Sequence, residues 1–378
     1  MRTHLDNGGD APLHPAARAA YLRALDDGWA DPRRLHAEGR RAAVLLGAAR
    51  ESLAASLGAR TEEVHLAASH TAALHAGVLA VRTGRRRRGP VVVLPRIERA
   101  AVRHAAELAL PGVEPRTELV DVDRAGRVDA EAMAAALALP GVALACLQQA
   151  NGEVGTCQPL ARVAEAARAA SVPLLVDAGA ALGHVPAPAA WDLLAADPAD
   201  WGGPRGVGVL AVRSRVRWGR SWPQDPEPWF PGGVSVPAAF AAAASLEAVT
   251  ADRQAEDERR RALVARVRAS VARIPDTEVV GDPQDRLPHV VTFSFLYVDG
   301  EALVTELDRA GFGVGSGSAC TASTLEPSHV LAAMGVLTHG NVRIALDRTT
   351  SEDDVDRFLA ELPRAVARVR SMLGAEGL

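Results

Sequence analysis

Short apolar segments alternate with helical patterns over the first 215 residues of the chain. The apolar segments are rich in β-branched residues and nearly continuous in apolarity, which is typical of parallel strands covered on both faces. The predicted strands are residues 63–67, 90–95, 118–122, 142–147, 172–178 and 207–213. Helical patterns lie between them, at 71–81, 98–108, 129–138 and 160–170. This alternation predicts a doubly wound α/β sheet, whose ligand sites lie beyond the carboxyl ends of the strands.

The pattern changes after residue 217. A segment rich in proline and tryptophan covers 218–233, and a long helix is predicted over 236–273. Strands are then predicted at 277–281, 289–295 and 341–346, with helices at 300–310, 326–334 and 351–373. This mixture predicts a second, smaller α+β domain. We place the boundary between the two domains within the long helix, near residue 255.

The composition fits an ordinary globular protein, since 48% of the 378 residues are apolar and 23% are charged. No apolar run approaches the roughly 18 residues that a membrane helix needs. The first residues lack a positive segment followed by an apolar one, so no secretory signal is predicted. Three cysteines, Cys146, Cys157 and Cys320, fit a reducing compartment better than a disulfide framework. We therefore expect a cytoplasmic protein that does not bind membranes.

The charge pattern predicts no nucleic-acid partner, and the histidine spacing predicts no metal site. The net charge is −4, and the basic run at residues 85–88 has no interleaved aromatic residues, so we interpret it as a solvated turn. The eleven histidines show no ligand spacing. His65, His70 and His75 lie close together in the sequence and are interpreted as packing and surface residues.

Lysine does not occur anywhere in the chain, and all 42 basic residues are arginine. A composition rich in alanine, arginine, glycine and proline indicates a GC-rich genome, which explains few lysines. It does not replace a lysine that chemistry requires. A Schiff-base lysine, a P-loop lysine and a lysine general base are all excluded.

Residues 313–335, GVGSGSACTASTLEPSHVLAAMG, form the most distinctive stretch. Cys320 lies there in a loop rich in glycine and serine, shortly before a predicted helix that starts near residues 326–328. Such a loop can carry a thiol to a partner, and a nearby helix N-terminus lowers the pKa of a thiol. The alternative is that Cys320 is an ordinary small buried residue.

This stretch resembles the persulfide-forming loop of the cysteine desulfurases, in the class V branch of the fold of pyridoxal-phosphate (PLP) enzymes. Other segments are similar to the family's motifs in order and spacing. They are HLDNGGDAPLHP (4–15), DPRRLHAEGRRA (31–42), QQANGEVGTCQPL (148–160), LLVDAGAALGHVP (174–186) and NVRIALDRTTSEDDVD (341–356). The resemblance spans essentially the whole chain. It implies a large domain over residues 14–255 and a small domain formed by 256–378 together with 1–13.

The chain also departs from the family's pattern at positions that the resemblance assigns to the cofactor. The glycines of WGGPRGVG hold the register of the lysine motif and place Asp200 where the Schiff-base lysine is expected. Further replacements are Asp197 for the phosphate-binding serine, Ala199 for the neighbouring histidine, Arg99 for the ring-stacking histidine, Ala180 for a glutamine and Gly233 for a threonine.

Four residues keep the identity that the resemblance expects. Thr71 matches a phosphate-binding threonine, Asn151 an asparagine of the pocket, and Asp177 the aspartate that pairs with the pyridinium nitrogen. Arg343 matches the arginine that holds a substrate carboxylate. Each has a simpler interpretation, because Asp177 can bond backbone amides and Arg343 can pair with a nearby acid. Thr71, Asn151, Asp177 and Asp200 are thus predicted to form a vestigial pocket, and no bound PLP is expected.

Three functions remain open at this point. The first is a sulfur-relay or partner protein that acts through the Cys320 loop. The second is an inert structural or regulatory pseudoenzyme that pairs with a lysine-bearing paralogue. The third is a cofactor-independent enzyme that uses Asp177, Asp200, His75 or Cys320 in the old cleft. We expect a homodimer or a heterodimer with a related desulfurase, and a sulfur-acceptor protein as a further partner.

Overall fold

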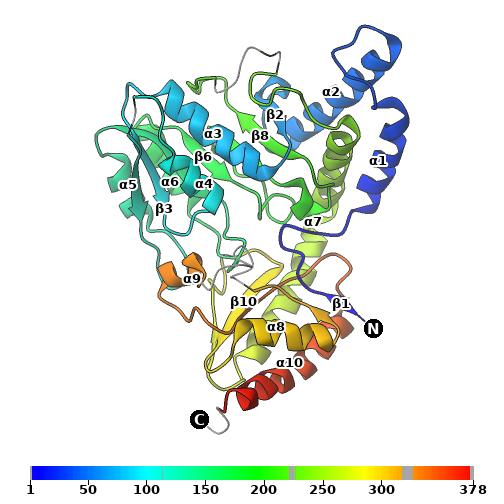
Figure 1. Ribbon diagram of the computed structural model, residues 1–378, viewed down its shortest axis with the longest axis vertical. Coiled ribbons are helices and arrows are strands. Elements are labelled where there is room, and N and C mark those ends of the chain that lie inside the picture. Colours follow the sequence, from blue (N-terminus) through cyan, green and yellow to red (C-terminus); the bar gives the residue numbers. More distant parts are fainter. Residues whose placement is uncertain (1, 113, 221–224, 226, 317–326, 375–378) are drawn as a thin grey trace.

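The structure is a computed structural model that describes residues 2–112, 114–220, 225, 227–316 and 327–374. Seven strands form the sheet of the larger part, in the order β2-β8-β7-β6-β5-β3-β4 (Figure 1). They are β2 (Val64–Ala67), β3 (Val91–Pro95), β4 (Arg116–Val120), β5 (Val142–Gln148), β6 (Leu174–Asp177), β7 (Leu193–Ala196) and β8 (Gly208–Val212). Neighbouring strands are parallel from β4 to β7, whereas β8 runs antiparallel to β7 and β2. The predicted doubly wound α/β fold is confirmed.

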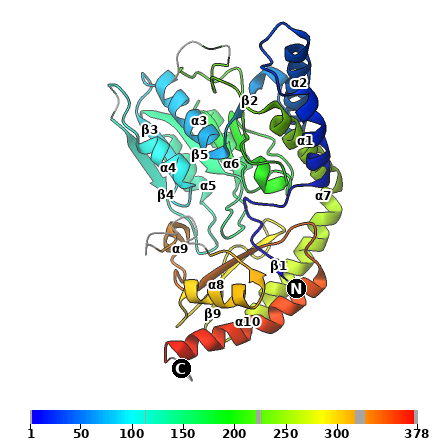
Figure 2. The same ribbon diagram turned by 45° about the vertical axis from the view of Figure 1, so that its right-hand side comes forward.

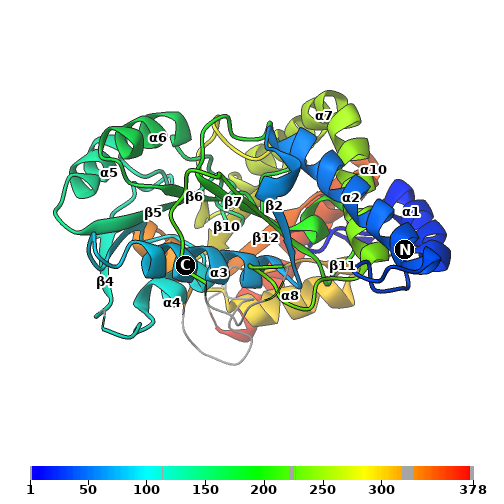
Figure 3. The same ribbon diagram turned by 90° about the horizontal axis from the view of Figure 1, so that it is seen from above.

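Helices cover both faces of this sheet, as Figure 3 shows from above. One face carries α3 (His70–Gly84) and α4 (Ala100–Glu107), and the other carries α5 (Ala130–Leu137) and α6 (Leu160–Ala169). Strand side chains alternate between the two resulting cores, so that Leu175 packs with α3 and Val176 packs on the opposite side. Because both faces are covered, the strands read as continuous apolar runs in the sequence.

The smaller part contains an antiparallel sheet in the order β12-β10-β9, covered by helices. Its elements are β9 (Thr277–Val279), β10 (Val290–Phe295), α8 (Gly300–Arg309), β11 (Phe312–Gly313), α9 (His329–Met334), β12 (Asn341–Ala345) and α10 (Glu352–Met372). The N-terminal strand β1 (Thr3–His4) pairs in parallel with β11, which places the start of the chain against this part. Among the described residues, no helix combines the length and apolarity that crossing a membrane requires.

Helix α7 (Val236–Val271) belongs to both parts and runs along one side of the molecule (Figure 2). Its first half packs against α1 (Pro15–Asp27) and α2 (Ala37–Leu57), and Leu246 joins the core of the large part. Its second half contributes Val264 and Val271 to the core of the small part. The boundary near residue 255 falls inside this helix and stays a prediction.

Candidate functional site

The carboxyl ends of β5 and β6 meet at the edge of the large sheet that faces the smaller part. Gln148 ends β5 and Asp177 ends β6, and the two residues are partners in the parallel register. Both side chains are buried. This is where a doubly wound sheet forms its ligand site, so Asp177 lies at the position that its motif predicts.

Side chains of this chain already occupy both carboxylate oxygens of Asp177. His70 Nε2 lies 2.9 Å from Oδ1, and Arg99 Nε donates to Oδ2 at 3.0 Å. The backbone N–H of Gly179 also donates to Oδ1, at 2.8 Å. Burial by itself would raise the pKa of Asp177, but His70 and Arg99 outweigh it and hold the pKa well below its usual range. Asp177 is therefore an anion with its partners in place.

The sequence positions His70 against Asp177 through a helix cap and a glycine. Ser69 caps α3 by accepting from the N–H of Ala72 at 3.1 Å, and His70 is the first residue of the helix. A Cβ atom at position 179 would lie 2.3 Å from Cε1 of His70, so only glycine leaves room for the ring. The interpretation of His70 as a packing or surface residue is wrong, because its ring pairs with the central carboxylate.

Asp200 lies in a second, separate buried cluster. Its Oδ1 accepts from the N–H of Gly9 at 2.7 Å, and its Oδ2 lies 3.0 Å from Nε2 of His184. The other ring nitrogen of His184, Nδ1, lies 3.0 Å from a guanidinium nitrogen of Arg260. Because arginine can only donate, Nδ1 accepts and the ring proton sits on Nε2, which donates to the backbone carbonyl of Asp200 at 3.1 Å. The position expected for the lysine is thus held in a chain of Arg260, His184 and Asp200.

The same cluster contains a group of potential metal ligands, which the sequence spacing did not predict. One ligand atom from each of His184, Asp200 and His289 lies within 4.8 Å of the others. The imidazole rings of His184 and His289 are stacked, with centroids 3.8 Å apart. With its proton on Nε2, His184 has no lone pair to offer on the side of Asp200. The arrangement therefore favours a hydrogen-bonded cluster over a metal centre.

The remaining predicted residues lie around these two clusters. Thr71 is exposed at the start of α3. Asn151 is buried, and its side-chain oxygen accepts from the N–H groups of Glu153 and Val154, both at 2.9 Å. Arg343 pairs with Asp6 at 2.8 Å, so the arginine expected for a substrate carboxylate already has an anionic partner. Cys320 lies outside the described residues.

Glu98 is a buried acid that sequence reasoning missed. Its carboxylate accepts from the N–H of Gln148 at 2.6 Å, and its side chain is fully buried. Burial first, and then the negative charge of Asp177, raise the pKa of Glu98 to about 8. Two neighbouring carboxyl groups with pKa values pushed apart can serve as an acid and a base. The available signal was its place directly before Arg99, at the start of the helical pattern predicted over 98–108.

The two described cysteines are poor nucleophiles. Cys146 is buried in β5, and burial raises the pKa of its thiol well above the ordinary value. Burial also raises the pKa of the half-buried Cys157 to about 11, although nearby arginines oppose it. Since the thiolate is the reactive form, neither residue is suited to sulfur chemistry at neutral pH.

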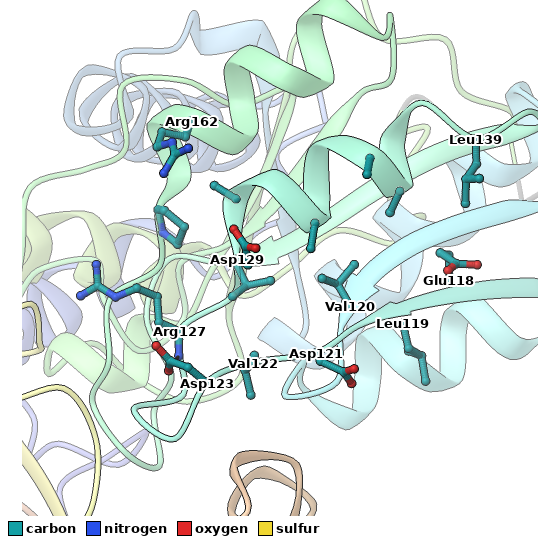
Figure 4. A pocket seen from close by; sticks show the side chains of 16 residues that line it. Glu118, Leu119, Val120, Asp121, Val122, Asp123, Arg127, Asp129, Leu139 and Arg162 are labelled. Carbon is teal, nitrogen blue, oxygen red and sulfur yellow. Dashed lines mark hydrogen bonds between the residues drawn. The ribbon is translucent and has the colours of Figure 1, made fainter.

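A pocket of about 990 Å³ lies away from Asp177, beside the edge strand β4 and α5 (Figure 4). Most of the charged side chains that line it have partners elsewhere in the chain. Arg127 pairs with Asp282 and Asp285, both at 2.9 Å, and Asp129 caps α5. Among the described residues, the charged groups of this pocket are thus mostly engaged in contacts that do not involve a ligand.

Comparisons with known proteins agree with the motifs. The family described as Aminotransferase class-V matches residues 3–358 of the chain. A cysteine desulfurase of Cereibacter sphaeroides is 35% identical over 99% of this chain and 99% of its own length. The chain belongs to the cysteine desulfurase family. The cysteine desulfurase IscS of Methanosarcina thermophila is 29% identical over 98% of this chain and 93% of its own length.

Solved structures show the same fold. A NifS-like protein superposes with a TM-score of 0.88 at 23% identity, over 96% of this chain and 99% of that chain. The apo structure of a cysteine desulfurase from Thermococcus onnurineus NA1 gives a TM-score of 0.84 at 19% identity, over 97% and 94% of the two chains. Cysteine desulfurases normally use PLP.

Proposed function

We propose that this member of the cysteine desulfurase family does not hold PLP and acts as a sulfur-relay or partner protein through Cys320. One observation carries the first half of the proposal: both oxygens of Asp177 are engaged, by His70 at 2.9 Å and by Arg99 at 3.0 Å. The family resemblance assigns this aspartate to the pyridinium nitrogen of PLP. Here the imidazole of His70 and the guanidinium of Arg99 make the contacts to this carboxylate that the cofactor ring would make.

The residues of the cleft do not fit PLP. The chain has no lysine to form an imine with the aldehyde, and Asp200 is bonded to Gly9 and His184 instead. Asp197, at the position of the phosphate-binding serine, lies 4.0 Å from His70. A carboxylate about 4 Å from a phosphate charge repels it by about 4 kcal/mol at an effective dielectric constant near 20. This corresponds to roughly a thousandfold loss of affinity.

Cys320 supports the second half of the proposal. Its sequence context matches the persulfide-forming loop, and the raised pKa values of Cys146 and Cys157 leave it as the best nucleophile of the three cysteines. In a relay, the Cys320 thiolate attacks the terminal sulfur of a persulfide on a PLP-loaded desulfurase. The donor's sulfur–sulfur bond breaks, a new one forms on Cys320, and the donor leaves as a thiolate. No external oxidant or reductant is needed.

Mass spectrometry tests the relay directly. The protein is mixed with a working desulfurase and cysteine, and each cysteine-containing peptide is examined for one added sulfur atom. We expect the added sulfur on Cys320, no transfer to a Cys320→Ser variant, and full transfer to a Cys157→Ser control. Absence of sulfur on Cys320, or equal labelling of Cys157, contradicts the relay.

The buried contacts of Asp177 also favour a second candidate, an inert partner that keeps the fold for assembly with a lysine-bearing paralogue. In that case the protein co-purifies with the paralogue as a heterodimer, and Cys320→Ser changes nothing. The third alternative is a cofactor-independent enzyme that uses Asp177, Asp200, His75 or Cys320, and Glu98 joins this set because its pKa and that of Asp177 are shifted in opposite directions. A small molecule retained in the cleft after purification would favour it. The relay also requires an assembly, as a homodimer or with a desulfurase, together with a sulfur acceptor.

A further inference from the structure

A groove of about 870 Å³ lies at the opposite end of the large sheet from Asp177. Its lining comes from segments that precede β2, β6 and β7 and from residues 213–217, which follow the antiparallel strand β8. These segments all meet at the amino ends of the parallel strands, and Leu174, the first residue of β6, lines the groove. Asp177 ends the same strand, so the groove is distinct from the cleft.

Arginine dominates the charge of the groove. Six arginines line it, Arg60, Arg85, Arg168, Arg213, Arg215 and Arg217, against two acids, Glu63 and Asp192. The groove thus carries four excess positive charges (6 − 2), whereas the whole chain carries −4. Such a concentration of one sign in a concave surface attracts and holds anions. The volume falls in the range of small-molecule sites.

Both acids form ion pairs with arginines that line the groove. Glu63 pairs with Arg213 at 3.1 Å and Arg60 at 3.3 Å, and Asp192 pairs with Arg215 at 2.8 Å. The Arg213 guanidinium also lies 3.7 Å from the centre of the Trp191 ring, which fixes its plane. These contacts orient the guanidinium groups of Arg60, Arg213 and Arg215 at the groove.

The side chains of two further lining arginines have no partner among the described residues. Arg168, on the last turn of α6, and Arg217 are both exposed, and neither guanidinium makes a hydrogen bond or ion pair within the described part of the chain. They can turn toward a ligand without breaking a contact. Arginine is the side chain best suited to bind phosphate, because its planar fork of N–H donors matches two phosphate oxygens at once.

Buried donors in the lining also lack acceptors within the described part of the chain. Trp191 Nε1 and Arg85 Nε are both buried without a hydrogen-bond partner there. Burial lowers the pKa of Arg85, and the neighbouring cations Arg88 and Arg217 lower it further, against the opposing effect of Asp192. Arg88 belongs to the basic run that we interpreted as a solvated turn. The run adds positive charge beside the groove.

We propose that this arginine groove binds a small anion with several phosphate groups, such as a nucleoside triphosphate or an inorganic polyphosphate. Four excess cations call for a ligand with several negative charges, and the concave shape favours a small molecule over an extended polymer. The proposal goes beyond the sulfur relay, because it uses neither Cys320 nor the cleft around Asp177. Anion binding by the groove and sulfur relay through Cys320 can therefore be disproved independently of each other.

Calorimetric titration with inorganic tripolyphosphate and with ATP tests the groove, using the full chain. We expect saturable binding of one ligand per chain that weakens as salt is raised. Arg168→Glu combined with Arg217→Glu should weaken binding at least tenfold. The matched control is Arg18→Glu combined with Arg23→Glu, two exposed arginines of α1 with the same change of net charge. The control should bind within twofold of the wild type.

Three results would overturn the proposal. They are the absence of tripolyphosphate and ATP binding to the wild type, an equal loss in both double variants, and binding of duplex DNA without binding of either small anion. Circular dichroism and thermal unfolding verify that all variants fold. Because the side chains of Arg168 and Arg217 are exposed and without partners in the described structure, their substitution should lower the unfolding temperature only slightly, through the charge reversal in the last turn of α6.

Discussion

Replacing Asp177 by asparagine should lower the free energy of unfolding substantially. Asparagine keeps the volume and can still accept from the N–H of Gly179, but it removes the negative charge between His70 and Arg99. Removing one partner of a buried ion pair typically costs about 3–5 kcal/mol. The Arg99 side chain is 42% exposed, so water recovers part of this loss. We expect a decrease of about 2–4 kcal/mol.

Urea denaturation followed by circular dichroism measures this change, with Asp121→Asn as the matched control. Asp121 also pairs with one arginine, Arg96, but its side chain is 80% exposed. Exposed pairs contribute about 0–1 kcal/mol, so the control should be nearly neutral. A double-mutant cycle with His70→Phe then isolates the contact between His70 and Asp177, with an expected coupling of about 0.5–3 kcal/mol.

The result that would refute this reasoning is a loss for Asp177→Asn no larger than for the control. It would mean that Asp177 is not held by His70 and Arg99 in solution and remains free to pair with a bound ligand. The contribution of Asp177 also has a defined pH dependence. Since its pKa is lowered in the folded state, the stabilisation is present above the unfolded pKa near 4 and is lost as the pH falls below it.

Three further predictions follow from the buried groups. Glu98→Gln should flatten the pH dependence of the free energy of unfolding, because the raised pKa of about 8 makes the wild type lose stability as the pH rises from about 4 to 8. Urea denaturation of both proteins across this range measures the two slopes, and an equal slope in the variant and the wild type would contradict the prediction. Gly179→Ala should cost about 1–3 kcal/mol by overpacking, and His70→Ala should suppress that cost; an additive double variant would contradict the contact. His184→Phe should cost about 1–3 kcal/mol in urea denaturation, because it removes the neutral imidazole beside the buried Asp200, and a neutral effect would contradict a role for His184 in holding Asp200.

The large sheet could be predicted from the sequence because its buried strands read as apolar runs. The strand Leu193–Ala196 escaped prediction, since it has four residues and none is β-branched. Helices α1 and α2 gave no clear pattern because alanine, which dominates their buried positions, marks an apolar face only weakly. Local sequence patterns thus identify helices and strands that bury large apolar side chains and miss those that bury mainly alanine.

The site was predictable by position and unpredictable in its contacts. The motif placed Asp177 at the end of a strand, where the structure has it. Its partner Arg99 lies 78 positions away in the sequence, and His70 comes from the start of another helix. The sequence around His70 and the sequence around Arg99 give no sign that both side chains contact the carboxylate of Asp177. The paired signal was available in hindsight, as a histidine at position 70 and a glycine at position 179 that leaves room for its ring.

The most direct test of the central claim is the amount of PLP that the purified chain retains after incubation with the cofactor and gel filtration. A lysine-containing cysteine desulfurase serves as the positive control. With Asp177 held by His70 and Arg99, and Asp200 in place of the lysine, we predict no retained PLP and no imine absorption band. One equivalent of PLP per chain, together with sulfide release from cysteine by this protein alone, would contradict the account.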